Sequence, residues 1–360
     1  MRIGVVTSAY HPDVGGVETH TRRLCTGLAA GGDEVEVLTQ HARAVEERID
    51  GVLVRRFPLS LGRPDYRFSV ALWRWLSGHA HGYDVLHAHS YHALAALPAA
   101  VTNRTPLVFT PHYHGTGHSR LRAALHPIYR PVGRRIVDRA GRIVCVTRAE
   151  RDLLLRDFRD AAGRIVVIPN GTDPLCHATT GGPGGIIVCV GRLERYKRVD
   201  RVIRAMTRLP GHRLEVVGAG PARADCERLA AELGLGDDRV RFHGRLAADA
   251  FTDLMATAAA AVSASAHEAF GMAVADALAA GIPTVASDLP AHRELAAMAG
   301  DGVWLVSPED EPALADALRA AAAADRPAAP ARLPTWADVV LATREVYAGI
   351  VPRLVGSSDR

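Results

Sequence analysis

Lysine is almost absent from this 360-residue chain: 42 of its 43 basic residues are arginine, and Lys197 is the single lysine. The chain also lacks any uncharged apolar run of about 18 residues, which excludes a membrane-spanning helix. Its five cysteines are widely spaced and form no Cys-x-x-Cys pair, so they predict neither a zinc site nor a disulfide framework. The Gly-x-Gly-x-x-Gly and Walker A signatures are missing too, which disfavours dinucleotide oxidoreductases and P-loop enzymes.

The charge is unevenly divided between the two halves of the chain. Residues 1–170 hold 23 arginines and 15 acidic residues, whereas residues 171–360 hold 20 basic and 24 acidic ones. A basic N-terminal half could attract an anionic acceptor or a membrane surface. Alternatively, its arginines could simply form a solvated face. No nucleic-acid partner is expected. Residues 1–6 read as a strand with no signal-peptide hydrophobic region after it, and unpaired thiols fit a cytoplasmic protein.

Short apolar strands alternate with helical patterns along the whole chain. This alternation predicts βαβ units with right-handed crossovers onto parallel sheets, and the length fits two domains. The expected strands are residues 2–7, 34–39, 52–57, 85–88, 107–110, 143–146, 165–168, 185–190, 213–217, 240–242, 260–263, 284–286 and 302–305. The expected helices are residues 19–30, 68–79, 91–101, 127–139, 148–157, 198–208, 221–233, 247–256, 273–280, 290–297, 311–323 and 336–350.

Glycine and proline content marks the domain boundary. Residues 174–185 are rich in both and predict a linker, so residues 1–173 and 186–334 form the two expected domains. Residues 325–334 read as a second, stiffer linker. Beyond it, residues 335–360 hold a final helix, expected to pack back on the N-terminal domain, and a tail.

Three segments have the composition of a phosphate-binding and sugar-binding site. Gly15 and Gly16 lie between the first strand and the following helix, where glycine lets the backbone approach a ligand and helix amides favour phosphate. Arg192 and Lys197 follow the first strand of the second half, and two cations of different shape there suit a diphosphate.

The segment from Glu268 to Asp276 is the most informative of the three. One carboxylate precedes a glycine-containing turn into a helix, and a second follows eight residues later. Carboxylates accept hydrogen bonds from sugar and ribose hydroxyls, while the N-terminus of the helix between them favours phosphate.

Taken together and in this order, these segments resemble the motifs of retaining GT-B glycosyltransferases of family 4 (GT4). That group includes phosphatidylinositol mannosyltransferases and many sugar transferases of bacterial glycolipid, polysaccharide and natural-product pathways. The resemblance covers nearly the whole chain. The further matching segments are His87-Ala88-His89-Ser90, Thr110-Pro111-His112-Tyr113-His114-Gly115, Ile168-Pro169-Asn170-Gly171-Thr172-Asp173, Gly218-Ala219-Gly220-Pro221 and Phe242-His243-Gly244.

The resemblance implies an α/β, GT-B fold with two Rossmann-like domains whose parallel sheets face a central cleft. Residues 1–173 would form the acceptor-side domain and residues 186–334 the domain that binds the nucleotide-sugar. The implied enzyme is a retaining hexosyltransferase-type glycosyltransferase that moves a sugar from a UDP- or GDP-sugar to a hydroxyl of a small-molecule, glycan or lipid-linked acceptor. No cofactor and no metal are expected, because fixed cations neutralise the diphosphate.

The same resemblance implies a role for each site residue. Arg192 and Lys197 would bind the donor diphosphate, and the backbone of Gly15 and Gly16 would approach it. Glu268 would contact the sugar hydroxyls, and the amides of Phe270, Gly271 and Met272 would contact sugar and phosphate. Asp276 would contact the ribose. His112 would contact the sugar and help to stabilise the positive charge at the reacting carbon.

Two positions depart from the family pattern. Asp276 stands where the family usually has glutamate, so we expect a longer or water-mediated ribose contact and weaker donor binding. Arg198 stands where glycine is common, which puts the shape of that loop in doubt.

Histidines and arginines are concentrated in the first half. Six histidines are close in sequence, and they favour the lining of a polar cleft over a metal cluster because they lie on different elements: His87, His89, His92, His112, His114 and His118. Residues 118–139 form a basic amphipathic stretch. It could contact the inner face of a membrane peripherally, bind an anionic acceptor, or present a solvated helix face.

Other functions remain open at this stage. A nucleotide-sugar 2-epimerase or a phosphorylase could share the two-domain architecture. A non-catalytic protein that binds nucleotide-sugars is a further alternative, for which the shorter Asp276 side chain is the motive.

Overall fold

The computed structural model describes residues 1–60, 67–91, 93–102, 104–113, 120–173, 185–326 and 331–351, with the backbone alone for 120–128. The chain forms two compact units, which we call unit 1 (Met1–Pro169 with Trp336–Arg360) and unit 2 (Asn170–Thr335). Unit 2 begins before the expected boundary at residue 174, because Thr172 forms a β-bridge with Thr335. The expected linker 174–185 lies almost wholly outside the described residues.

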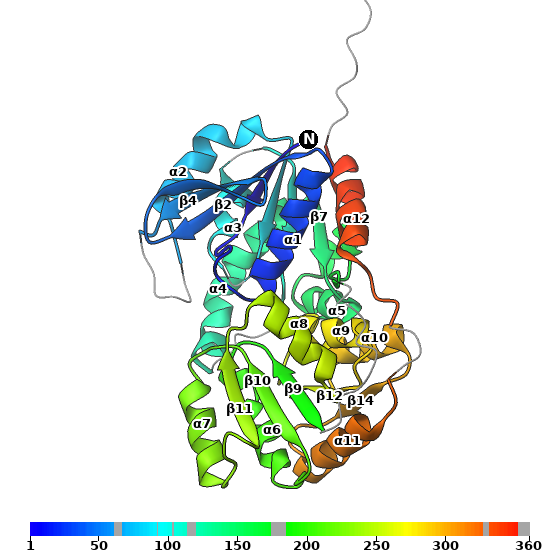
Figure 1. Ribbon diagram of the computed structural model, residues 1–360. Coiled ribbons are helices and arrows are strands. Elements are labelled where there is room, and N and C mark those ends of the chain that lie inside the picture. Colours follow the sequence, from blue (N-terminus) through cyan, green and yellow to red (C-terminus); the bar gives the residue numbers. More distant parts are fainter. Residues whose placement is uncertain are drawn as a thin grey trace, which may run out of the picture. The chain divides into compact units, whose positions relative to one another are not determined.

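Unit 1 is built on an eight-stranded sheet with the order β3-β4-β2-β1-β5-β6-β7-β8 (Figure 1). All neighbouring strands pair in parallel except β3, which runs antiparallel to β4. Their bounds are β1 (Arg2–Val6), β2 (Glu34–His41), β3 (Val45–Ile49), β4 (Val52–Pro58), β5 (Val85–His89), β6 (Leu107–Thr110), β7 (Arg142–Cys145) and β8 (Ile165–Val167).

Helices cover both faces of this sheet, because successive strand residues point to opposite sides. In β1, Ile3 and Val5 join a core with helices α1 and α12, whereas Val6 joins the core formed with α2, α3 and α4. The helices are α1 (Gly16–Ala30), α2 (Val70–His79), α3 (Ala96–Val101), α4 (Arg120–Arg139), α5 (Arg148–Asp157) and α12 (Trp336–Ala348).

Unit 2 contains a six-stranded, wholly parallel sheet with the order β11-β10-β9-β12-β13-β14. Its strands are β9 (Ile186–Val190), β10 (Arg213–Val217), β11 (Val240–Gly244), β12 (Ala260–Ser263), β13 (Thr284–Ser287) and β14 (Val303–Val306). The helices are α6 (Val199–Met206), α7 (Arg223–Glu232), α8 (Ala248–Thr257), α9 (Met272–Ala279), α10 (Pro290–Ala299) and α11 (Glu311–Ala323). Helices α6, α7 and α11 share one apolar core with the sheet, and α8 and α9 share another.

Two expectations about unit 1 were wrong, and one strand was missed. Strand β3 was not predicted, because four of its five side chains are exposed and leave no apolar pattern. Helix α3 begins at Ala96 rather than at Tyr91, since the Tyr91 amide donates instead to Pro111 O at 2.7 Å. Helix α4 begins at Arg120, so that Pro127, expected as its first residue, lies inside it.

The last helix, α12, belongs to unit 1. Its side chains Val339, Val340 and Tyr347 are buried in the same core as Leu24 of α1. The two helices approach closely at Gly27, where an added Cβ would lie 2.5 Å from Val340 Cγ2. Among the described residues, no helix combines the length and the apolar character needed to cross a bilayer.

We predict that Gly27→Ala destabilises the protein by about 1–3 kcal/mol, although alanine is the better helix former, because the branched Val340 side chain cannot move away. Urea unfolding measures this change. The double variant Gly27→Ala/Val340→Ala should recover much of the loss, since the clash is then gone. Gly78→Ala in α2 is the matched control: no atom lies within 4 Å of its added Cβ, so it should not destabilise.

Candidate functional site

In unit 2, glycines bring the loops after β9 and β10 into backbone contact. A Cβ on Gly218 would lie 1.9 Å from Gly191 O, and one on Gly220 would lie 2.4 Å from Leu193 O. The Leu193 amide donates to Ala219 O at 2.9 Å. Because backbone packs on backbone here, the segment that carries Arg192 is fixed at the carboxyl end of the sheet, where ligands of parallel sheets bind.

Lys197 and Glu268 form an ion pair in this part of unit 2. Lys197 Nζ lies 2.6 Å from Glu268 Oε1, and the two side chains are 21% and 15% exposed. Burial would lower the pKa of Lys197, but the Glu268 carboxylate outweighs it and raises that pKa above its usual range. Burial likewise opposes ionisation of Glu268, yet Lys197 holds the pKa of this carboxyl below its usual range. Both groups are therefore charged at neutral pH.

Glu268 lies just before helix α9, whose N-terminus is shaped around a histidine. Gly271, the N-cap, has φ 99°, and a Cβ there would lie 2.9 Å from His292 Nε2. The fully buried His292 ring is fixed by a 2.8 Å hydrogen bond from Nδ1 to Ser287 O. Since a carbonyl only accepts, Nδ1 carries the proton. Burial holds the pKa of His292 below its usual range, so its Nε2 is a lone-pair acceptor.

The remaining predicted residues of unit 2 lie on the segments that carry this pair. Arg192 is exposed, and its guanidinium donates to Tyr196 Oη at 3.2 Å. The Tyr196 ring stacks on His267 with centroids 4.7 Å apart. Phe270 is buried, and Met272 is the first residue of α9. Asp276 lies in the second turn of α9, partly buried, as expected for a residue on the helix that follows Glu268.

In unit 1, Gly15 and Gly16 form the N-terminus of α1. Gly15 is the N-cap, with an extended backbone, and no side chain caps this helix end. Gly16 is exposed, so solvent reaches the start of α1, where uncapped helix amides favour an anion.

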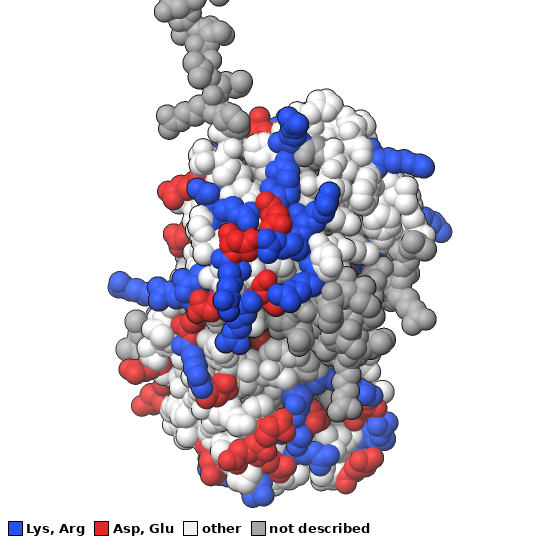
Figure 2. Space-filling view, turned by 180° about the vertical axis from the view of Figure 1, so that it is seen from behind, with Lys and Arg blue, Asp and Glu red and all other residues white. Residues whose placement is uncertain are grey.

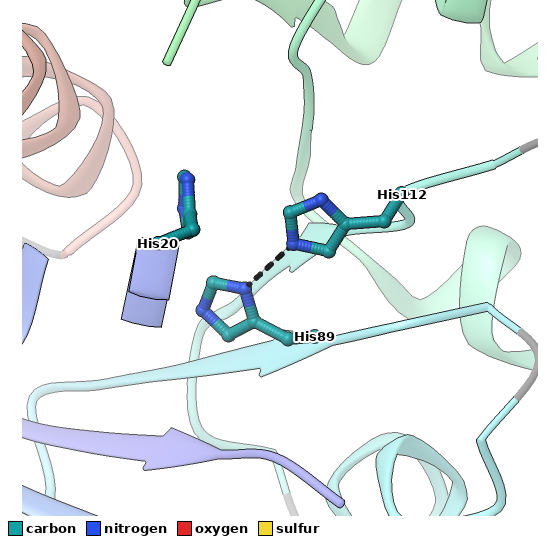
Figure 3. Close-up of side chains that lie close together, drawn as sticks. All are labelled: His20, His89 and His112. Carbon is teal, nitrogen blue, oxygen red and sulfur yellow. Dashed lines mark hydrogen bonds between the residues drawn. The ribbon is translucent and has the colours of Figure 1, made fainter. Parts of the chain in front are cut away.

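His112 lies in unit 1 with two other buried histidines, His20 of α1 and His89 of β5 (Figure 3). His89 Nδ1 is 3.4 Å from His112 Nε2, and the His20 ring centroid is 5.1 Å from that of His112. His112 has φ 47°, a left-handed conformation that is uncommon outside glycine. Burial and the neighbouring histidines hold the pKa of His89 well below its usual range, so its imidazole is neutral.

A fourth histidine, His87, adjoins this group and forms two hydrogen bonds. His87 bonds Tyr347 Oη of α12 through Nδ1 and Thr110 Oγ1 of β6 through Nε2, both at 2.7 Å. Burial lowers the pKa of His87 to about 3. Within the part of the chain that the structure describes, His20, His89 and His112 are the one group whose ligand atoms, within 4.8 Å of one another, could hold a metal ion. His92, His114 and His118 lie outside the described residues.

In the part of the basic stretch 118–139 whose side chains are described, two of the four arginines form ion pairs with acidic residues. Arg134 pairs with Asp138 and Asp160, and Arg130 pairs with Asp157. Figure 2 shows basic and acidic side chains interspersed rather than a field of one sign on the face that it presents. These pairs favour the solvated-face interpretation of the stretch.

Sequence reasoning missed several residues that the structure places beside the predicted ones. His20, Tyr196 and His292 contact predicted site residues or their loops, and Glu150 accepts a hydrogen bond from the Tyr113 amide at 2.5 Å. Only Tyr196 has a sequence signal, since it stands between Arg192 and Lys197. The others come from segments that meet only in the fold.

Comparison with solved structures shows the class of fold. Sucrose-phosphate synthase from Thermosynechococcus elongatus is similar with a TM-score of 0.72, at 23% identity over 97% of this chain and 94% of that one. The Anabaena protein HepE, solved in complex with UDP and glucose, has a TM-score of 0.75 at 18% identity, over 96% of this chain and 99% of that one. The predicted α/β, GT-B class with two Rossmann-like domains is thereby confirmed.

Sequence comparison shows the family. Residues 14–174 match the model "Glycosyltransferase Family 4", and residues 181–329 match "Glycosyl transferases group 1". A phosphatidyl-myo-inositol mannosyltransferase of Mycolicibacterium smegmatis is 32% identical, over 88% of this chain and 84% of its own. A D-inositol 3-phosphate glycosyltransferase of Nocardia farcinica is 30% identical, over 77% and 70%. The chain belongs to the GT4-type glycosyltransferases.

The structure also resolves the doubt about Arg198. This residue has φ 53° and ψ 36°, the left-handed conformation in which glycine is free of strain. The Arg198 side chain pairs with Glu309. Arginine therefore keeps the loop shape that glycine would have.

We predict that Arg198→Gly is more stable than Arg198→Ala by about 1 kcal/mol, because both lose the Glu309 pair but only glycine relieves the left-handed strain. The difference in urea midpoint between the two variants measures this strain directly. Equal midpoints would contradict the strained conformation.

Proposed function

We propose that the chain transfers a sugar from a UDP- or GDP-sugar to an acceptor hydroxyl, with retention of anomeric configuration and without a metal ion. The observation that carries this proposal is the Lys197–Glu268 ion pair beside the α9 N-terminus. A fixed ammonium, a fixed carboxylate and a helix N-terminus within one site suit a ligand that has both phosphates and hydroxyls.

Electrostatics favours departure of a nucleoside diphosphate at this site. The leaving group gains negative charge in the transition state, and Lys197, Arg192 and the Phe270–Met272 amides would stabilise it. Two cations make a metal ion unnecessary for that purpose. The roles of Gly15, Gly16 and His112 toward the same donor rest on the family motifs.

The acceptor is proposed from the relatives. Two of them act, by their names, on inositol carrying a phosphate, either free or in a lipid. A phosphate-bearing polyol is therefore the first acceptor class to test, ahead of other small molecules, glycans and lipid-linked sugars. Retention rests on the family resemblance, and a cytoplasmic location rests on cysteines that are free and buried where described.

We predict that Lys197→Ala and Glu268→Ala each lower the rate of sugar transfer about a hundredfold, roughly 3 kcal/mol of transition-state stabilisation. Each change removes a ligand contact and leaves its former partner buried without a counter-charge. Transfer from radiolabelled UDP- and GDP-sugars to inositol phosphates measures the effect. Glu227→Ala is the control, because it breaks an exposed ion pair with Arg223 on α7.

The same assay tests the rest of the proposal. Release of nucleotide that needs no acceptor would indicate an epimerase, and nucleotide binding without transfer would indicate a binding protein. EDTA is expected to leave the rate unchanged. Loss of activity in EDTA that zinc restores would contradict the metal-free mechanism and direct attention to His20, His89 and His112. Near-normal activity of both alanine variants would overturn the site.

We predict that Asp276→Glu tightens nucleotide binding about fivefold, the value of about one direct hydrogen bond, because the longer side chain reaches the ribose without a bridging water. Isothermal titration with UDP and GDP measures the dissociation constants. Asp249→Glu on α8 makes the same chemical change at an exposed position and should leave binding unaltered. Weaker binding by Asp276→Glu would refute the ribose contact.

A further inference from the structure

A buried glutamate of unit 1, Glu150, forms a hydrogen bond with the loop that carries His112. Glu150 lies in the first turn of α5 and is only 2% exposed. Its Oε1 accepts the Tyr113 amide at 2.5 Å, and its Oε2 accepts the Val146 amide at 2.6 Å. Tyr113 directly follows His112, so one carboxylate joins the His112 loop to the end of β7.

Ordinary helix capping does not account for this arrangement. The N-cap of α5 is Thr147, whose hydroxyl accepts the Glu150 amide at 2.9 Å. The side chain of a glutamate at this position usually accepts a hydrogen bond from the N-cap amide and stays near solvent. Here its two oxygens serve the amides of Val146 and of a residue 37 positions earlier.

Burial of this carboxylate is costly. Among the described residues, Glu150 pairs with no lysine or arginine, and burial raises its pKa to about 8 although both amide hydrogen bonds oppose the shift. A glutamine of similar shape would avoid that cost but offers one acceptor oxygen instead of two. Only a carboxylate can therefore accept both amide hydrogen bonds at this position.

The His112 loop is held from both sides. Before His112, Thr110 bonds the His87 ring at 2.7 Å. After it, Tyr113 is bound by its amide to Glu150 and by its phenol to Asp157, at the opposite end of α5. A left-handed, non-glycine residue persists only when its surroundings enforce it. These contacts supply that enforcement.

We propose that Glu150 is a positioning residue that holds His112 in its left-handed conformation through the Tyr113 amide. The proposal rests on the proposed function, in which His112 contacts the transferred sugar. Glu150 itself touches no substrate.

The proposal makes transfer depend on the charge of Glu150. A protonated carboxyl has one good acceptor oxygen, so we expect one of the two amide hydrogen bonds to weaken as the pH falls through about 8. Among the described residues, the ionisable side chains nearest to it along these segments are His112 and Tyr113 on the loop and Cys145 on β7; burial raises the pKa of both Tyr113 and Cys145 far above that of Glu150. We therefore expect kcat to rise as the pH rises through about 8.

The test compares Glu150→Gln with the wild type over pH 6.5–9.5. At pH 9 we expect kcat to fall about tenfold, the donor KM to change less than twofold, and the rise near pH 8 to disappear. Glu36→Gln is the matched control: Glu36 is a buried glutamate of β2 that bonds Arg55 and Tyr83, away from the His112 loop. It should keep the wild-type pH profile.

A second measurement needs no activity and no Glu150 variant. With ¹⁵N-tyrosine labelling, one of eight tyrosine amides should resonate far downfield at high pH and shift with a midpoint near pH 8. Tyr113→Phe, which removes that signal, assigns it. A Tyr113 amide that does not titrate, or Glu150→Gln with unchanged kcat and pH profile, would overturn the proposal. Absence of transfer by the wild type would instead defeat the proposed function and leave the amide titration decisive.

Discussion

The Lys197–Glu268 ion pair is the interaction on which the candidate site of unit 2 depends. Two opposite charges, each largely removed from water, are stable only because they lie 2.6 Å apart. That spacing requires the loop after β9 and the loop before α9 to be fixed to a fraction of an ångström. The glycine-to-backbone contacts on one side and the buried His292 ring on the other fix them.

The predicted contact residue of unit 1 lies in a different physical environment. This residue, His112, belongs to a group of buried histidines, and burial holds the pKa of two of them, His87 and His89, below the usual range. What this group requires is orientation, and β5, β6, α1 and α12 all contribute side chains to it. In the proposed reaction, the charged pair of unit 2 would stabilise the departing phosphate, and an oriented side chain of unit 1 would hold the hydroxyl-rich sugar.

The buried parallel strands could be predicted from the sequence to within a few residues, because each is a short continuous apolar run. The exposed edge strand β3 could not, since solvent on most of its side chains removes the pattern. Site residues within motifs, such as Lys197 and Glu268, were predicted and meet in the fold. His20, Glu150 and His292 were not, because their importance comes from contacts between segments distant in the chain and not from any local spacing.

Unit 1 is discontinuous in the chain, and this has a consequence for biosynthesis. Tyr347 and Val339 complete the core around Leu24, yet they are made only after all of unit 2. During translation, the whole sequence of unit 2 is available before unit 1 is complete. Until α12 has been made, one face of unit 1 remains partly uncovered. The N-terminal half is thus the last to mature, and chaperone binding during synthesis should concentrate on the apolar face of α1.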